Sequence, residues 1–276
     1  MKTIKVKNIN VLKEIIKNSP VDADLNHLDV STIKDFSELF RNSKFNGDIS
    51  KWNTKSVENM TRIFACSEFT GDISKWNVSN VKTMADAFAK SKFNGDISKW
   101  DTSNVITMER MFANSNFDGD ISKWNTSKVE DMSCMFYKSN FTGNVSKWDV
   151  SNVLYFQGMF AYSKFNKDLS KWNTKNALYL SGMFKESIFN KDISNWDVSN
   201  VQDTSSMFAF SKFNKDISTW NTKNLLALDT MFLKSKFNHD LSKWKIKKNN
   251  VSMCFAFTKS PLENKAPAWY KEYIIS

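Results

Sequence analysis

Apolar residues return at fixed places in a 24-residue pattern along nearly the whole chain. Tryptophan occurs every 24 residues from Trp52 to Trp244, and phenylalanine does so from Phe45 to Phe237 and from Phe40 to Phe232. A polar column keeps the same register, since serine recurs from Ser50 to Ser242. Such a period is typical of repeat proteins, in which each unit buries its apolar face against its neighbours. The pattern therefore predicts one continuous stack of similar units.

Each unit reads F-N-G-D-I-S-K-W-N-T-S-N-V-x-x-M-x-x-M-F-x-x-S-K. In its second half, apolar residues such as Val105, Met108 and Phe112 have the spacing of one helical face, and a preceding Thr or Ser is a good N-cap. The first half, D-I-S-K-W, predicts a short strand that ends near Ser50 or Lys51, with Trp52 turned inward at the corner. One short parallel strand and one helix in each 24-residue unit predict an α/β fold, a right-handed solenoid.

The register divides the whole chain. It places an N-terminal cap at residues 1–20, ten repeats at 21–261, and a partial repeat with a C-terminal cap at 262–276. Nine of the ten repeats have 24 residues, and the phase slips by one after Trp244, so that the tenth has 25. Leu28 takes the tryptophan position of the first repeat, as expected of an atypical terminal unit. No linker interrupts the register, which predicts one continuous domain.

Two of the units carry a family resemblance. The segments G-D-I-S-K-W-N-V-S-N-V-K-T-M-A-D-A-F and G-D-I-S-K-W-D-T-S-N-V-I-T-M-E-R-M-F resemble the BspA-like leucine-rich repeats of bacterial surface proteins. The resemblance covers residues 21–260, and the opening V-L-K-E-I-I-K-N is similar to the usual start of such arrays. It implies a leucine-rich-repeat-like solenoid with a binding role, often adhesion to host proteins. It implies no enzymatic activity and no catalytic residues.

The composition leaves little for catalysis or cofactor binding. The chain has two histidines, three cysteines without a C-x-x-C pair, seven glycines and three prolines. Stacked units would bring the aspartates from Asp48 to Asp240 into one column. These carboxylates either accept hydrogen bonds from turn amides or form a divalent-cation array, since like charges so close are otherwise unfavourable. We favour the turn-capping interpretation and expect no enzyme, no catalytic residue, no metal ligand and no cofactor.

The N-terminal sequence predicts a cellular location. The basic start M-K-T-I-K-V-K is not followed by an apolar run, and no stretch approaches the ~18 consecutive apolar residues of a membrane span. We therefore expect a cytoplasmic monomer without a secretion signal or a membrane-spanning segment. The family resemblance leaves a surface or secreted location as the alternative.

Positive charge is concentrated in the second half of the chain. The net charge is +10; residues 161–276 hold 18 basic and 10 acidic residues, against 21 and 19 in residues 1–160. The glycine column that begins at Gly47 continues as Lys167, Lys191 and Lys215, which should lie on or beside the strand face. Such a field favours acidic proteins or phosphate backbones. With 36 lysines and only three arginines, base-specific readout of nucleic acid is disfavoured.

Aromatic and apolar residues replace polar ones in several columns of the second half. These residues are Tyr137, Leu154, Tyr155, Tyr162, Leu178, Tyr179 and Phe210. Stacking of neighbouring units would gather them into an exposed patch, and tyrosine-rich patches are favoured at interfaces. Packing between adjacent units or against the C-terminal cap is the alternative. Together with Lys167, Lys191 and Lys215, they are the candidate partner-binding residues.

The sequence therefore predicts a non-enzymatic repeat scaffold that binds a macromolecular partner, a protein, through the second half of the stack. One alternative is an inhibitor that binds nucleic acid or a nucleoprotein and belongs to phage or host defence, which the basic half and the expected cytoplasmic location suggest. Another is a secreted adhesin, which the family resemblance implies.

Overall fold

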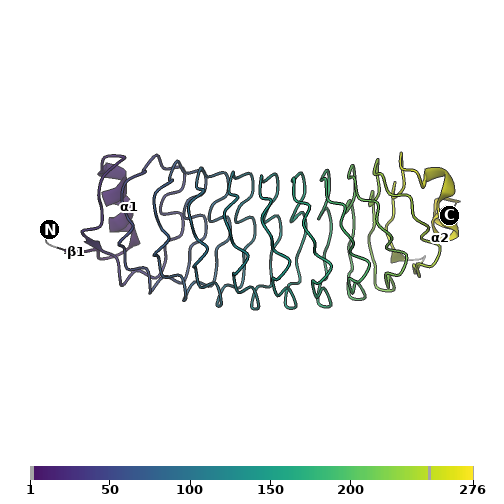
Figure 1. The fold of residues 1–276 in the computed structure, drawn as a ribbon, viewed down its shortest axis with the longest axis horizontal. Coiled ribbons are helices and arrows are strands. Elements are labelled where there is room, and N and C mark those ends of the chain that lie inside the picture. Colours follow the sequence, from purple (N-terminus) through teal and green to yellow (C-terminus); the bar gives the residue numbers. More distant parts are fainter. Residues whose placement is uncertain (1–2, 248–249, 276) are drawn as a thin grey trace.

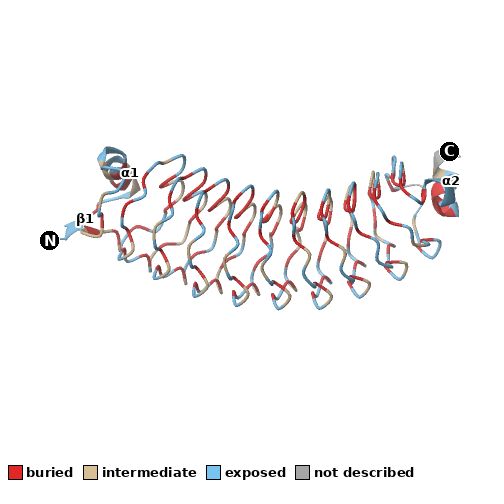
Figure 2. Ribbon diagram, turned by 45° about the horizontal axis from the view of Figure 1, so that its top comes forward, coloured by how far each residue is buried: buried red, intermediate tan, exposed pale blue. Residues whose placement is uncertain are grey.

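The chain forms a bowed row of coils with a cap at each end (Figure 1, Figure 2). The computed structural model describes residues 3–247 and 250–275. The elements, in order, are β1 (Ile4–Lys5), α1 (Ile9–Asn18), β2 (Leu28–Asp29), the 3-10 helix η2 (Glu263–Lys265) and α2 (Ala268–Ile275). Helix α1 lies at one end of the row and α2 at the other, so the two termini are far apart (Figure 1).

The predicted α/β fold, a right-handed leucine-rich-repeat-like solenoid with one strand and one helix per repeat, is wrong. Between residues 30 and 262, the described residues contain no α-helix and no strand. Neighbouring coils are joined instead by isolated parallel bridges, such as Thr83 with Thr107 and Thr107 with Asp131. The one regular sheet of the described chain is the parallel pair β1–β2, in which Ile4 lies opposite Leu28.

Left-handed backbone angles replace the predicted helix. Arg110 and Asn114 have φ angles of 54° and 55°. The two corresponding positions are also left-handed in all the remaining coils, from Glu38 and Asn42 to Phe255 and Lys259. An L-residue in this conformation interrupts an α-helix. The freed N–H groups reach the next coil, since Arg110 donates to the carbonyl of Ser133 at 2.8 Å and Asn114 to that of Tyr137 at 2.7 Å. The spacing of apolar residues by three and four therefore comes from successive turns.

A turn also replaces the predicted strand. The carboxylate of Asp120 accepts a hydrogen bond from the N–H of Ser122 at 2.9 Å, and the N–H of Trp124 donates to the carbonyl of Ile121 at 3.2 Å. The chain thus turns where extended pairing was expected. The ring of Trp124 is buried, and its indole N–H donates to the carbonyl of Ile97 in the preceding coil at 3.1 Å. The expectation of an inward-turned tryptophan at this corner is confirmed.

The aspartate column caps these turns along the stack, as the favoured interpretation predicted. In most coils the N–H of the serine two residues on donates to the carboxylate at about 2.8–2.9 Å, as Ser74 does to Asp72. Hydrogen bonds from these serines lower the pKa of the carboxyl groups, because they stabilise the ionised form. The affected residues are Asp48, Asp72, Asp96, Asp120, Asp168, Asp192, Asp216 and Asp240.

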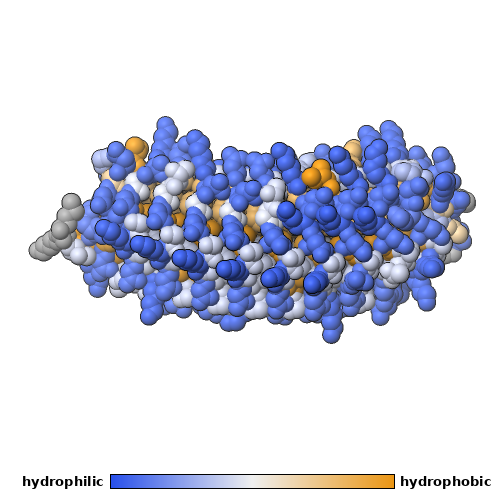
Figure 3. Space-filling view, in the orientation of Figure 1, coloured by the Kyte–Doolittle hydropathy of each residue, from blue (hydrophilic) through white to orange (hydrophobic). Residues whose placement is uncertain are grey.

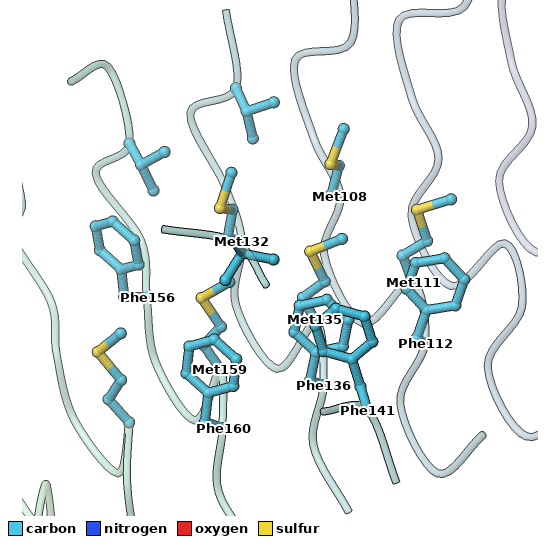
Figure 4. Close-up of a cluster of buried hydrophobic side chains, with 14 of the residues drawn as sticks. Met108, Met111, Phe112, Met132, Met135, Phe136, Phe141, Phe156, Met159 and Phe160 are labelled. Atoms are coloured by element: carbon cyan, nitrogen blue, oxygen red, sulfur yellow. The ribbon is translucent and has the colours of Figure 1, made fainter. Parts of the chain in front are cut away.

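Stacked aromatic rings fill the interior of the coils. Phe112 stacks on Phe136 of the next coil, with centroids 5.9 Å apart and ring planes 9° apart, and on Phe117 of its own coil at 4.2 Å. Methionines such as Met111 and Met135 lie beside these rings (Figure 4). Burial of a ring removes roughly 150–250 Å² of surface from water, so these columns are the main source of cohesion. The aromatic columns that repeat along the sequence are therefore core.

Caps cover the two ends of the stack. At the first end, the side chain of Asn8 accepts a hydrogen bond from the N–H of Val11 and begins α1, which buries Leu12 and Ile16. At the other end, Trp269 of α2 donates its indole N–H to the carbonyl of Leu241 at 3.0 Å. It thereby continues the tryptophan column of the coils.

Candidate interaction surface

Two of the predicted tyrosines form a stacked pair. Tyr155 and Tyr179 are partners in a parallel bridge between neighbouring coils, and their half-buried rings lie 5.7 Å apart with planes 3° apart. Leu154 and Leu178 precede them and are also half-buried; the N–H of Leu178 donates to the carbonyl of Leu154 at 3.0 Å. The structure therefore brings these four candidate residues together in one strip across two coils.

A second pair of tyrosines, one from the coil before Tyr155 and one from the coil of Tyr155, carries lysine ammonium groups. Tyr137 and Tyr162 meet edge to face, with centroids 5.3 Å apart and planes at 71°. The Nζ atom of Lys138 lies 5.4 Å from the ring centroid of Tyr137 and 5.1 Å from that of Tyr162. The Nζ atom of Lys185 lies 5.8 Å from the centroid of Tyr162. We call these four residues the tyrosine–lysine cluster.

Phe210 stands apart from the tyrosines. It is 41% exposed, and the ammonium group of Lys234 lies 5.2 Å from its ring centroid. In the described structure, no aromatic contact joins Phe210 to a tyrosine. It repeats the pairing of lysine with an aromatic ring further along the stack.

The lysines Lys167, Lys191 and Lys215 form a separate, exposed group. They lie in the column beside the capping aspartates, away from the tyrosine pairs in the sequence of each coil. The pKa of Asp168 is lowered first by hydrogen bonds from its serine and further by the charges of lysines that include Lys191. Lys215 acts on Asp192 in the same way. The positive field of this column is therefore partly neutralised by its own neighbours.

The first half of the stack carries a ladder of ion pairs at one of the left-handed positions. Arg62 lies between Glu38 and Asp86 of the adjacent coils, at 3.4 and 3.3 Å, and Arg110 continues the ladder to Asp86 at 2.9 Å. Arg41 joins it through Glu38 at 2.8 Å. The three arginines of the chain are all engaged in this ladder.

A second, shorter ladder runs beside it. Glu58 binds Lys34 at 2.9 Å and Lys82 at 2.8 Å, and hydrogen bonds from these lysines lower the pKa of Glu58 to about 2. Every ion pair among the described residues lies between positions 34 and 110. The lysines of the second half have no carboxylate within ion-pair distance in the part of the chain that is described.

Glycines replace the charged ladder in the two coils that carry Tyr155 and Tyr179. Gly158 and Gly182 have φ angles of +61° and +62°, in the column that holds Arg62 and Asp86 earlier in the chain. A Cβ atom at Gly182 would meet no atom closer than 4.0 Å, and one at Gly158 would meet only the Sγ atom of Cys134, at 3.0 Å. Each coil passes from the bridge tyrosine through the glycine toward the cluster. The two adjacent glycine positions therefore carry no side chain, and we call Gly158 and Gly182 the bare strip.

Other chemistry is sparse over the described residues. They contain no group of three or more His, Cys, Asp or Glu side chains that could hold a metal ion. Among their helices, none is long and apolar enough to cross a membrane. The face shown in Figure 3 is mostly hydrophilic, with small hydrophobic spots between hydrophilic residues.

Comparison with known families gives a match along almost the whole stack. The profile of the family described as Mycoplasma protein of unknown function, DUF285, matches residues 7–118, 63–164, 113–209 and 180–269. The chain belongs to this family. The four overlapping matches agree with the internal repeat, and BspA-like repeats are related to this family. Searches of curated proteins and of solved structures gave no match.

Two features of this DUF285 chain escaped the sequence analysis. One is the ion-pair ladder, although the alternation of Glu38, Arg62, Asp86 and Arg110 at 24-residue spacing is a usable signal. The other is the bare strip, because Gly158 lies in a column where every coil needs a left-handed residue and most coils use a side chain. Both signals become readable once the column is known to face outward.

Proposed function

We propose that this DUF285 protein is a non-enzymatic, cytoplasmic scaffold that binds a protein partner through the second half of its stack. One observation carries the proposal: arginines, lysines and carboxylates of neighbouring coils pair between positions 34 and 110, whereas Lys138 and Lys185 lie over tyrosine rings and have no carboxylate within ion-pair distance among the described residues. The ladders of the first half are therefore partly neutralised by their own contacts. The tyrosine–lysine cluster instead offers half-buried rings and ammonium groups that lack an ion pair in the described structure.

The composition of this surface supports a protein partner. Tyrosine is enriched at protein interfaces because its ring is large and rigid and its hydroxyl can form a hydrogen bond. Tyr155 and Tyr179 are held parallel by the bridge between their coils, so little side-chain entropy would be lost on binding. The relationship to BspA-like repeats, whose surface members bind proteins, also favours a binding role. It keeps a secreted adhesin as the alternative.

A nucleic-acid partner has weaker support. The excess of positive charge beyond residue 160 favours it. However, Lys191 and Lys215 lie close enough to Asp168 and Asp192 to lower the pKa of these carboxyl groups. Like-sign carboxylates along this column would repel a phosphate backbone.

Affinity capture from lysate of the native host tests the proposal. The bait is the wild-type chain, the variant Tyr155→Ala/Tyr179→Ala, or the control Thr83→Ala/Thr107→Ala, which changes the same bridge column in the first half. We expect one protein to be captured by the wild type and the control, lost with the tyrosine variant, and unaffected by nuclease. Capture that survives the tyrosine substitutions would contradict the proposal. So would capture that needs nucleic acid and falls steeply between about 50 and 200 mM salt.

A further inference from the structure

The ammonium group of Lys138 is positioned by two rings and by no acid. It lies over both Tyr137 and Tyr162, at 5.4 and 5.1 Å from their centroids, and Lys185 approaches Tyr162 from the next coil at 5.8 Å. Contacts of this kind hold a cation near the ring face without neutralising its charge. No ion pair forms here in the described structure. In the column four residues earlier, by contrast, Arg62 of the first half pairs with Glu38 and Asp86.

The cationic area is small and bounded. The column of Lys138 continues as Tyr162, Glu186 and Phe210, so a carboxylate follows directly after the cluster. A long polyanion that ran along the stack would meet Glu186 at once, whereas one or two anionic side chains would fit beside Lys138 and Lys185. Lysine as the only cation also favours a single charge–charge contact over the forked contacts that arginine makes with phosphates.

The bare strip lies next to the cluster. Because Gly158 and Gly182 carry no side chain, another polypeptide backbone could approach the coil backbone there more closely than elsewhere on this face. The edges of the strip are aromatic on both sides, with Tyr155 and Tyr179 before the glycines and Tyr162 after Gly158. Such borders suit apolar or aromatic side chains of an extended segment.

We propose that the tyrosine–lysine cluster binds an acidic, extended segment of a partner protein, with Asp or Glu carboxylates at Lys138 and Lys185 and the backbone of the segment over Gly158 and Gly182. The proposal rests on the proposed protein-binding function and adds the chemical class of what is recognised. Charge complementarity carries it, since two ammonium groups that are oriented by tyrosine rings have no carboxylate within ion-pair distance among the described residues.

A random-peptide library displayed on phage tests the proposal without knowledge of the natural partner. We expect selection on the wild-type chain to enrich peptides rich in Asp and Glu. The affinity of the best peptide, measured by fluorescence polarisation, should weaken about threefold or more in Lys138→Gln/Lys185→Gln, since each exposed charge pair contributes a modest part of the affinity. The substitution Glu186→Gln should strengthen binding, because it removes the neighbouring like charge.

A matched control uses the same column in the first half. Lys90 is exposed there and has no aromatic ring beneath it, so Lys90→Gln should leave peptide affinity unchanged. Selected peptides without an acidic excess, or equal binding by the Lys138→Gln/Lys185→Gln variant, would overturn the proposal. Specific binding of a DNA oligonucleotide that this variant abolishes would overturn it in favour of nucleic acid, and a dimer that the variant dissociates would do so in favour of a second copy.

The two proposals fail separately. If acidic peptides bind as expected but the Tyr155→Ala/Tyr179→Ala variant still captures its partner, the proposed function of that surface fails. The proposal that the tyrosine–lysine cluster binds an acidic segment then still stands. If the partner is lost with those tyrosines but no acidic peptide is selected, the inference about the cluster fails alone.

Discussion

The indole N–H of Trp124 donates to the main-chain carbonyl of Ile97, 27 residues earlier, at a distance of 3.1 Å. The same carbonyl also accepts the N–H of Trp100 at 3.2 Å within its own coil. Each tryptophan thus ties its coil to the preceding one with a polar contact that is buried in an aromatic core. This contact explains why the column keeps tryptophan rather than another large apolar residue.

Replacement of this tryptophan should therefore weaken the stack. Trp124→Phe keeps an aromatic ring in the core but removes the donor and part of the buried volume. We expect a loss of about 1–3 kcal/mol in the free energy of unfolding, measured by urea denaturation. A variant as stable as the wild type would show that the ring alone, and not its N–H, holds the coils together.

The capping aspartates should make stability depend on pH. Their pKa is lowered in the folded chain by the serine hydrogen bonds, so the unfolded chain binds more protons at acidic pH. The stabilisation is fully present above the ordinary pKa of aspartate, about 4, and is lost as the pH falls through the lower pKa of the folded state.

Asparagine should keep the cap and remove this dependence. Asn144 already does so, since its side chain accepts from the N–H of Ser146 at 3.0 Å. In Asp72→Asn/Asp120→Asn/Asp168→Asn, we expect the denaturation midpoint to fall less on acidification than in the wild type. Glu263→Gln, an exposed carboxylate outside the column, is the control and should not change the slope. An unchanged slope in the triple variant would contradict the assignment.

The glycines of the bare strip should differ in their tolerance of alanine. Gly182→Ala places a side chain at φ +62° in open space, and should reduce stability by about 1 kcal/mol. Gly158→Ala adds a contact of 3.0 Å with the Sγ atom of Cys134, so we expect a larger loss. Cys134→Ala should remove the difference in a double variant. Thermal denaturation of the wild type, the two single glycine variants and Gly158→Ala/Cys134→Ala measures this. An equal loss of stability at both glycines would contradict a clash with the Sγ atom of Cys134.

The ion-pair ladder should give the first half a salt-dependent stability. Asp86 binds both Arg62 and Arg110, so Asp86→Asn weakens two pairs and should lower stability by about 1 kcal/mol at low ionic strength, and less at high salt. Asp118→Asn is the control, because Asp118 accepts a hydrogen bond from Thr142 and makes no ion pair in the described structure. Hydrogen exchange should locate the change in the coils around Arg62. A loss that does not depend on salt would argue against the ladder.

The repeat register was sufficient to identify the core but not its backbone conformation. Phe112 and Trp124 are buried as the 24-residue period predicts. The apolar spacing around Met108 nevertheless suggested a helix, because a series of turns returns side chains to the core at the same intervals of three and four. Propensity did not reveal the left-handed angle of Arg110, since most residues there are not glycine and inter-coil hydrogen bonds offset the strain.

The candidate surface was predictable in part for a similar reason. The period alone places Tyr155 beside Tyr179, and the two rings do stack. It could not show that Lys138 lies over the rings of Tyr137 and Tyr162, because those contacts depend on turn geometry and on neighbouring coils.

By itself, the sequence determined that equivalent residues lie one above another, which columns are buried, and where charge and aromatic residues accumulate. These follow from periodicity, because a side chain that recurs every 24 residues must meet its own kind in the next unit. Only the tertiary structure decided that the units are chains of turns and that the ion pairs among the described residues lie between positions 34 and 110. The reason is that N–H groups and side chains choose their partners between coils, where distances in space, rather than spacing along the chain, set the energy.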